Sequence, residues 1–182
     1  MLSPYVGPLA WAPGDGTAVA ATTTQTSLLT STAAVGKWPM PGSWFTAVGQ
    51  MLRITASGRV STPAATQGNL SFQFVIGAVN VAVSQVFTSV ANLTNTTWVL
   101  EWLLTLRSVG DGTLTTFIHT GKFFSDLVSL TAEVNLIPDT APAVGTGFNA
   151  AAGATADLQS TWSNNTAGNT IQLHQYLLES VN

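Results

Sequence analysis

Residues 98–124 constrain the fold more than any other stretch, because they contain two strand-like runs joined by a Gly-Asp-Gly turn. A period of two is typical of a β-strand with one face in a core, whereas a helix needs apolar residues at a spacing of about 3.6. The first run has large apolar residues at alternate positions: Trp98, Leu100, Trp102, Leu104 and Leu106. Gly110, Asp111 and Gly112 tolerate the backbone angles of a tight turn. The sequence therefore predicts a β-hairpin here.

The same alternation predicts strands elsewhere in the chain. A second hairpin is expected where two apolar runs flank Gly77 and Ala78. Between the strands, the large apolar side chains of Trp38, Trp44 and Phe45 are expected to be buried. Pro39 and nearby residues interrupt regular structure, so a packed irregular corner is expected. The predicted strands outside the 98–124 hairpin are residues 27–32, 50–61, 70–76, 79–83, 127–137, 156–163 and 171 to nearly the C-terminus.

Eight or nine such strands without a helical segment predict an all-β fold, an antiparallel β-sandwich. The length of the strands and the wide connections favour a jelly roll over an immunoglobulin-like arrangement. Residues 1–26 mix proline, glycine and small residues without periodicity, which predicts an extended N-terminal arm before a sandwich domain of residues 27–182. The Gly/Ala/Pro-rich residues 139–155 are expected to cross between sheets or to lie on another subunit. Tyr5 and Trp11 in the arm are expected to dock on a neighbour or on the chain's own body.

Charged side chains make up only 7% of the 182 residues, against about 25% in an ordinary soluble domain. Long charged side chains normally keep monomers apart. Their scarcity therefore favours surfaces that are covered by copies of the chain or by a partner. The alternative is a monomer with a neutral, threonine-rich surface. The net charge of −3 and five scattered basic residues disfavour nucleic-acid binding. No apolar run predicts a membrane span, and the first residues lack the pattern of a secretory signal, so synthesis in a cytoplasm is expected.

The sequence offers little for catalysis. It has no cysteine, which excludes disulfides, thiol chemistry and cysteine-based metal sites. His119 and His174 lie inside predicted strands and share parity with Phe117 and Tyr176, so each is interpreted as a structural or interface histidine rather than a general base. The eight acidic residues are scattered, and no Gly-x-Ser-x-Gly nucleophile motif occurs. We therefore predict no enzyme activity and no catalytic, cofactor-binding or metal-binding residue.

Three stretches carry a resemblance to a known group of proteins: GQMLRITASGRVST, TNTTWVLEWLLTLRSVGDGTLTTFIHTGKF and TWSNNTAGNTIQLHQYLLESVN. The chain resembles, over residues 27–182, structural proteins of tailed bacteriophages of actinobacteria. The resemblance implies a single jelly-roll domain, related in architecture to trimeric tumour-necrosis-factor-like and viral knob domains. Such proteins are carried on virions as capsid decoration or tail-associated components. No catalytic residue comes with the resemblance.

The expected function is therefore that of a homotrimeric capsid decoration, or minor capsid, protein. It would be assembled in the host bacterial cytoplasm, bind the major capsid protein on the outside of the phage head and stabilise the shell. Residues 1–20 would reach the shell or the adjacent protomer. The alternative is a tail-associated receptor-binding knob that recognises a host surface glycan, and a third reading is a carbohydrate-active enzyme on a jelly roll.

The second face of the first hairpin strand suggests where the trimer forms. Glu101 and Thr105 are joined there by apolar side chains, which is too apolar a composition for a solvated face. We therefore expect this face to pack against a symmetry mate. The predicted trimer-interface residues are Val99, Leu103, Arg107 and Val109.

Overall fold

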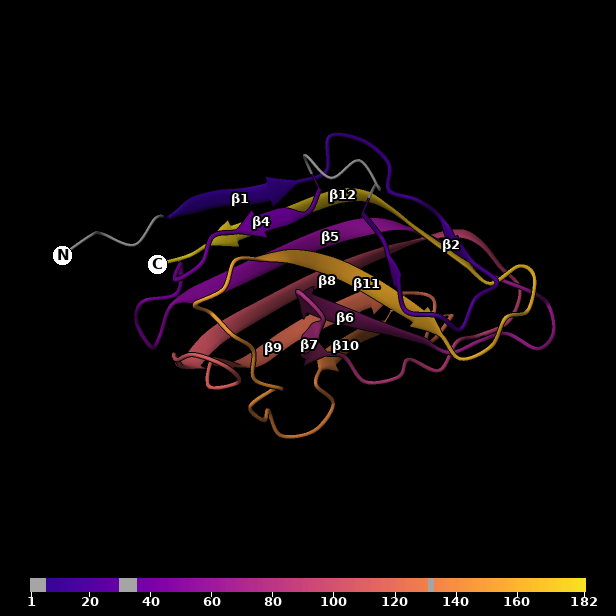
Figure 1. The fold of residues 1–182 in the computed structure, drawn as a ribbon. Helices are drawn as coiled ribbons and strands as arrows, with labels where there is room; N and C mark the ends of the chain where they lie inside the picture. Colours follow the sequence, from indigo (N-terminus) through magenta and orange to yellow (C-terminus); the bar gives the residue numbers. More distant parts are fainter. Residues whose placement is uncertain (1–5, 30–35, 131–132) are drawn as a thin grey trace.

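The computed structural model describes residues 6–29, 36–130 and 133–182, and within them the chain forms β-strands and no helix (Figure 1). The strands are β1 (Gly7–Trp11), β2 (Val19–Ala20), β3 (Thr26–Ser27), β4 (Trp38–Met40), β5 (Met51–Thr62), β6 (Leu70–Ile76), β7 (Val79–Val83), β8 (Leu93–Ser108), β9 (Thr116–Ser125), β10 (Glu133–Ile137), β11 (Ala154–Trp162) and β12 (Thr170–Ser180).

The strands form two antiparallel sheets. The large sheet has the order β1-β12-β5-β8-β9-β10, with β2 also paired to β12. The small sheet has the order β3-β11-β6-β7, with β4 also paired to β11. The pairs β1–β12, β4–β11, β5–β8 and β6–β7 are nested along the chain, from the outermost to the innermost. The predicted all-β, antiparallel sandwich is thus confirmed.

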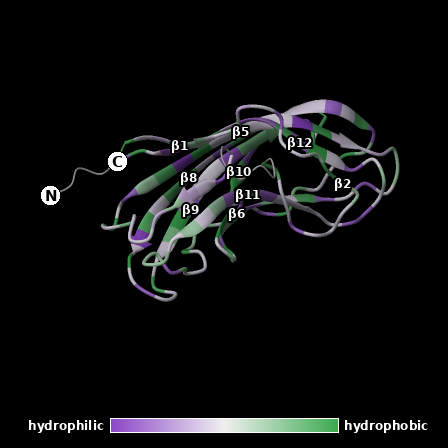
Figure 2. Ribbon diagram, turned by 45° about the horizontal axis from the view of Figure 1, so that its top comes forward, coloured by the Kyte–Doolittle hydropathy of each residue, from purple (hydrophilic) through white to green (hydrophobic). Residues whose placement is uncertain are grey.

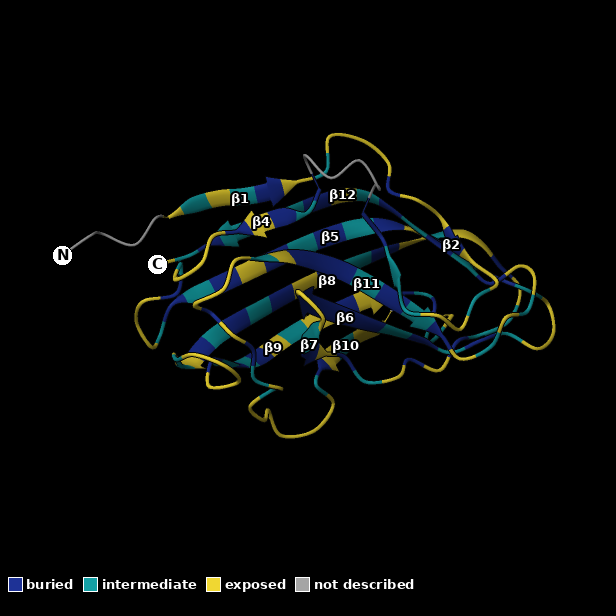
Figure 3. Ribbon diagram, viewed as in Figure 1, coloured by how far each residue is buried: buried dark blue, intermediate teal, exposed yellow. Residues whose placement is uncertain are grey.

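The core lies between the two sheets, and the alternation of β8 positions it. Every second residue from Trp98 to Leu106 is buried, as the sequence predicts, and the intervening residues face outward. Figures 2 and 3 show the same alternation of hydropathy and burial along the long strands. Trp162 on β11 of the small sheet is also fully buried and belongs to the same core. Each such side chain contributes roughly 2–3 kcal/mol of hydrophobic stabilisation.

The described part of the expected arm belongs to the sandwich. Residues Gly7–Trp11 form edge strand β1 along β12, and Val19–Ala20 pair with the other end of β12. Thr26–Ser27 pair with β11 in the other sheet. The first segment therefore pairs with strands of both sheets and does not extend away from the sandwich. Sequence periodicity does not detect it because each of these strands is short and lies at or near an edge, where proline and glycine are tolerated.

Other predicted strand boundaries change for local reasons. The expected strand 27–32 is reduced to β3, and residues 30–35 lie outside the described part of the chain. The corner around Pro39 contains the short strand β4, in which an edge position tolerates the missing proline N–H. The strand expected over 127–137 begins only at Glu133.

The long connection after Pro138 crosses from β10 in the large sheet to β11 in the small sheet, one of the two alternatives expected for residues 139–155. It is held along β9 by backbone pairing of Val144 with Ile118 and of Phe148 with Thr115. The Gly145 N–H also donates to the Phe117 carbonyl at 2.8 Å. The connection thereby closes one open edge of the sandwich.

Tyr176 faces the core from β12 and its hydroxyl finds no hydrogen-bond partner among the described residues. Burial, and then the negative charge of Asp157, raise its pKa, so the phenol stays protonated. A buried hydroxyl without a partner costs about 1–3 kcal/mol. We therefore expect Tyr176→Phe to raise the free energy of unfolding by about 1 kcal/mol in urea denaturation. A decrease would show that the hydroxyl is satisfied in solution.

Candidate functional site

The outer face of the large sheet carries an apolar surface over β8, β9 and β10. Register places Val99, Phe124 and Val134 in one row across the three strands. Leu136 is 68% exposed and Phe124 is 42% exposed, while Leu103 is half-buried. We call this surface the β8–β10 patch, and its residues are Val99, Leu103, Phe124, Val134 and Leu136.

An ion pair divides the patch into two hollows. The Lys122 Nζ lies 3.0 Å from the Glu101 carboxylate, and both side chains are about half exposed. A hollow of about 450 Å³ on one side is lined by Leu103 and Leu136, and a hollow of about 220 Å³ on the other side is lined by Val99, Phe124 and Val134. Arg53 on β5 is likewise paired, with Glu179 at 3.1 Å. These four charges are thus matched within the sheet, and the hollows between them are apolar.

The predicted interface residues occupy this region unequally. Val99, Leu103 and Arg107 share the outer face of β8, whereas Val109 lies beyond the strand in the turn that leads to β9. Phe124, Val134 and Leu136 complete the patch and were not predicted from the sequence as part of it. Alternation places Val134 and Leu136 on one face of β10, but alternation alone does not say whether that face is the inner or the outer one.

The structure places only one of the two aromatic residues that were predicted to make contacts from the arm. Tyr5 lies outside the described residues. Trp11 ends β1 opposite Leu177 and is 52% exposed. It lines a cleft of about 570 Å³ between the edge strands β1 and β4, together with Trp38 and Trp44. The rings of Trp38 and Trp44 meet edge to face at 4.8 Å.

The cleft has a charged rim. Lys37 lines it and its Nζ lies 3.0 Å from the carboxylate of Asp157. Asp157 is buried, and its carboxylate also accepts hydrogen bonds from Ser27 and Gln159, each at 2.8 Å. Because these partners satisfy the carboxylate, the ammonium of Lys37 is held in place at the mouth of the cleft.

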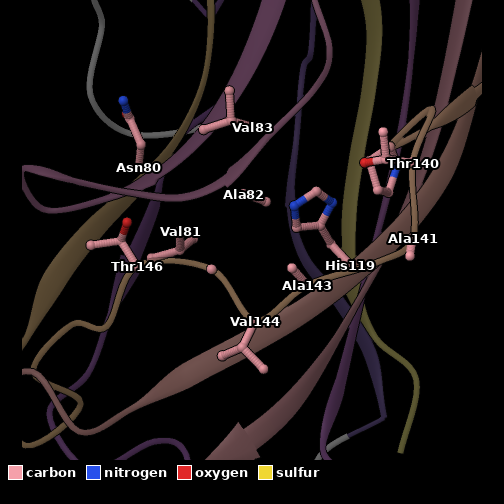
Figure 4. Close-up of a pocket in the computed structure, with 12 residues that line it drawn as sticks. Asn80, Val81, Ala82, Val83, His119, Thr140, Ala141, Ala143, Val144 and Thr146 are labelled. Carbon is pink, nitrogen blue, oxygen red and sulfur yellow. The ribbon is translucent and has the colours of Figure 1, made fainter.

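His119 occupies a pocket at the opposite edge of the sandwich. It is only 9% exposed and faces inward from β9, with the parity of Phe117 that the sequence predicts. The Trp102 indole N–H donates to its Nδ1 at 3.0 Å. In Figure 4 the imidazole lies among the residues that line the pocket, with Ala82 on one side and Thr140 on the other. Burial lowers the pKa of His119, so the ring is neutral at pH 7.

The Trp102–His119 hydrogen bond predicts a pH dependence of stability. An indole only donates, so protonation of Nδ1 would place two N–H groups against each other. The folded pKa lies below the unfolded value of 6.5, so below about pH 6.5 the unfolded chain binds more protons than the folded one. We expect the free energy of unfolding to be constant with respect to this group above pH 6.5 and to fall toward acid pH, by at most about 1.4 kcal/mol per pH unit.

Urea denaturation at several pH values between 4 and 8 measures this dependence. His119→Gln is the matched variant, because its amide oxygen can accept from Trp102 but does not titrate. The wild-type slope below pH 6.5 should exceed that of the variant. Equal slopes would contradict the assignment to His119.

His174 does not share the inward face of Tyr176 that the sequence suggests. The register of β12 with β5 shifts between Leu173 and Gln175, and this bulge turns His174 outward. Its Nδ1 lies 2.6 Å from the carboxylate of Asp15. Among the described residues, no group of three or more His, Asp or Glu side chains is placed to hold a metal ion. Within the same residues, no helix is long and apolar enough to cross a membrane.

Comparison with known proteins gives no relative. No family model, curated protein or solved structure matches the chain.

Proposed function

We propose that the chain is a bacteriophage virion structural protein, a homotrimeric decoration protein that binds the outer surface of the assembled head and stabilises it. The observation that carries this proposal is the β8–β10 patch, which presents apolar side chains on an open sheet face. The proposed partners are two further copies of the chain and the major capsid protein. The protein would be assembled with the virion in the host bacterial cytoplasm.

The nested strand pairs support a jelly roll as the finer description of the sandwich. A jelly roll forms when a long antiparallel hairpin folds over so that its strands are divided between two sheets. The four nested pairs of this chain follow that scheme, with β9 and β10 added beyond β8 as an extra hairpin. The extra hairpin supplies three of the five patch residues: Phe124, Val134 and Leu136.

The composition of the patch favours a second copy of the chain as its cover. Interface centres are apolar and poor in unpaired charge, and the Glu101–Lys122 pair already neutralises the two charges in the middle of the patch. The low charge of the whole chain leaves few repulsive contacts between copies. The number three rests on the resemblance to trimeric jelly-roll domains. Light scattering after size exclusion should give three times the 18.9 kDa chain mass, whereas a monomer at micromolar concentration would contradict the trimer.

Stabilisation of the head follows from mass action. A protein that binds the assembled shell and not the free capsid subunit shifts the equilibrium toward the shell. Antibody labelling of the chain on intact virions tests the location. We expect label over the heads. Label confined to the tail tip would overturn the decoration role and favour the alternative below.

Trp11 is the described aromatic residue of the first segment that is available for contact with the shell. We expect Trp11→Ser to fold normally, because the side chain is 52% exposed, and to bind undecorated heads at least about 10-fold more weakly. Cosedimentation with heads measures the binding, and Val48→Ser, at an exposed valine in the loop before β5, is the control. Deleting residues 1–20 is less informative because it also removes strand β1 from β12. Equal binding of wild type and Trp11→Ser would exclude this contact.

The cleft between β1 and β4 favours one alternative function, a receptor-binding knob for a host surface glycan. Indole rings pack against the C–H faces of sugar rings, and Trp11 and Trp44 are both accessible beside Lys37. Calorimetric titration with host cell-wall polysaccharide fragments tests it. Saturable binding that Trp11→Ser abolishes would support the knob, and absence of heat at millimolar sugar would exclude it.

A further inference from the structure

The pocket at His119, distinct from the β8–β10 patch and the tryptophan cleft, lies where the connection after β10 closes the edge of the sandwich. Strand β7 of the small sheet, His119 of β9 and residues 138–146 of the connection line a solvent-open pocket of about 200 Å³. The walls are mainly apolar. Figure 4 shows valine and alanine side chains around the imidazole, with Asn80 and Thr146 on one side of it and Thr140 on the other.

The hydrogen bond from Trp102 decides which nitrogen of His119 is free. Because the indole N–H donates to Nδ1, the proton of the neutral ring resides on Nε2. Among the described residues, no protein group accepts a hydrogen bond from Nε2, although the side chain is nine-tenths buried. The Nε2 atom itself is not fully buried and lines the pocket, so its N–H is open to an acceptor from outside the chain.

The same hydrogen bond restricts the charge of that acceptor. An anion beside Nε2 would favour the imidazolium, whose Nδ1–H would then face the N–H of Trp102. The apolar walls also disfavour a charge. A neutral oxygen acceptor, such as a carbonyl, satisfies Nε2 without disturbing Trp102.

The volume of the pocket limits the size of the molecule that it can hold. An apolar cavity of about 150 Å³ is known to hold a benzene molecule. We propose that the pocket of about 200 Å³ binds a small neutral molecule with an apolar body of about one ring and a carbonyl or hydroxyl oxygen that accepts a hydrogen bond from His119 Nε2.

Titration of the intact protein with benzamide tests the proposal, with toluene and benzoate as comparison ligands. Nitrogen-detected NMR of the histidine rings at pH 7.5 reports on Nε2 directly. We expect benzamide to shift the His119 Nε2 signal saturably and to leave His174 unchanged. One neutral hydrogen bond should make benzamide bind about 2- to 10-fold more tightly than toluene, and benzoate should bind more weakly than benzamide.

Two variants separate binding from folding. Ala143→Leu fills the pocket from its exposed connection and leaves the Trp102–His119 bond in place, so it should abolish the benzamide shift. His174→Gln, which changes the other histidine, should retain it. No saturable shift with benzamide, an equal affinity for toluene, a tighter affinity for benzoate, or a shift that persists in Ala143→Leu would each overturn the proposal.

Discussion

Gly58→Ala is expected to lower the free energy of unfolding by about 3 kcal/mol, although the substitution adds a single methyl group. A Cβ at this position of β5 would lie 1.9 Å from the carbonyl oxygen of Gln172 and 2.9 Å from the Cα of Leu173. Both contacts are with the backbone of β12, which cannot rotate away as a side chain would. The strands must therefore separate locally at a pair that joins two central strands of the large sheet.

The measurement is urea denaturation of the two proteins, followed by circular dichroism. Gly14→Ala is the matched control, because a Cβ there would meet no atom within 4 Å. We expect the control to change the free energy of unfolding by no more than about 0.5 kcal/mol. A Gly58→Ala protein as stable as the control would contradict the close approach of β12 to β5.

The close approach at Gly58 and the outward turn of His174 have one cause. Gly58 pairs with Leu173, while Ser57 pairs with Gln175, so His174 is the extra residue of a bulge. A bulge inserts one residue into one strand and reverses the parity beyond it. The sequence could not reveal this, since the alternation of β12 taken alone assigns His174 and Tyr176 to the same face.

Alternation predicted the interior where a strand is long and central. In β8 the apolar side chains from Trp98 to Leu106 fill the core, and in β5 Leu52 and Ile54 are buried while Arg53 is exposed, as the sequence indicates. A central strand has the core on one face, so its largest side chains identify that face. Edge strands lack this constraint. The short strands β1 and β4 contain proline, and their pairing depends on partners about 170 residues and about 115 residues away in the chain, which local patterns do not encode.

The candidate sites were only partly accessible from the sequence for the same reason. Val99 and Leu103 stood out because they interrupt an otherwise polar face. Val134 and Leu136 did not, because their face becomes apparent only when β10 pairs with β9. The pocket at His119 depends on the connection folding back along β9, which joins residues far apart in the chain.

Leu103→Glu should disperse the proposed trimer while leaving the fold intact. Leu103 is half-buried on the outer face of β8, so a glutamate can reach water in the monomer. In the assembly the same carboxylate would be buried in the larger hollow of the patch, within a surface whose charges are already paired. Arg53 lies opposite Leu103 but is already paired with Glu179, so the new carboxylate has no partner of its own. A buried charge in that position costs about 3 kcal/mol or more, which corresponds to at least about a 100-fold weaker association.

Light scattering after size exclusion gives the mass, and circular dichroism establishes that the variant is folded. Val48→Glu places the same charge at an exposed valine in the loop before β5 and should leave the mass unchanged. A folded Leu103→Glu protein that keeps the wild-type mass would show that the contact between copies is not centred on the larger hollow of the patch. Phe124→Glu distinguishes a misplaced centre from a wrong face, because Phe124 lies in the smaller hollow on the other side of the ion pair. If both variants stay assembled, the patch contacts another partner and not a second copy. If Leu103→Glu stays assembled and Phe124→Glu does not, the contact between copies is centred on the row of Val99, Phe124 and Val134.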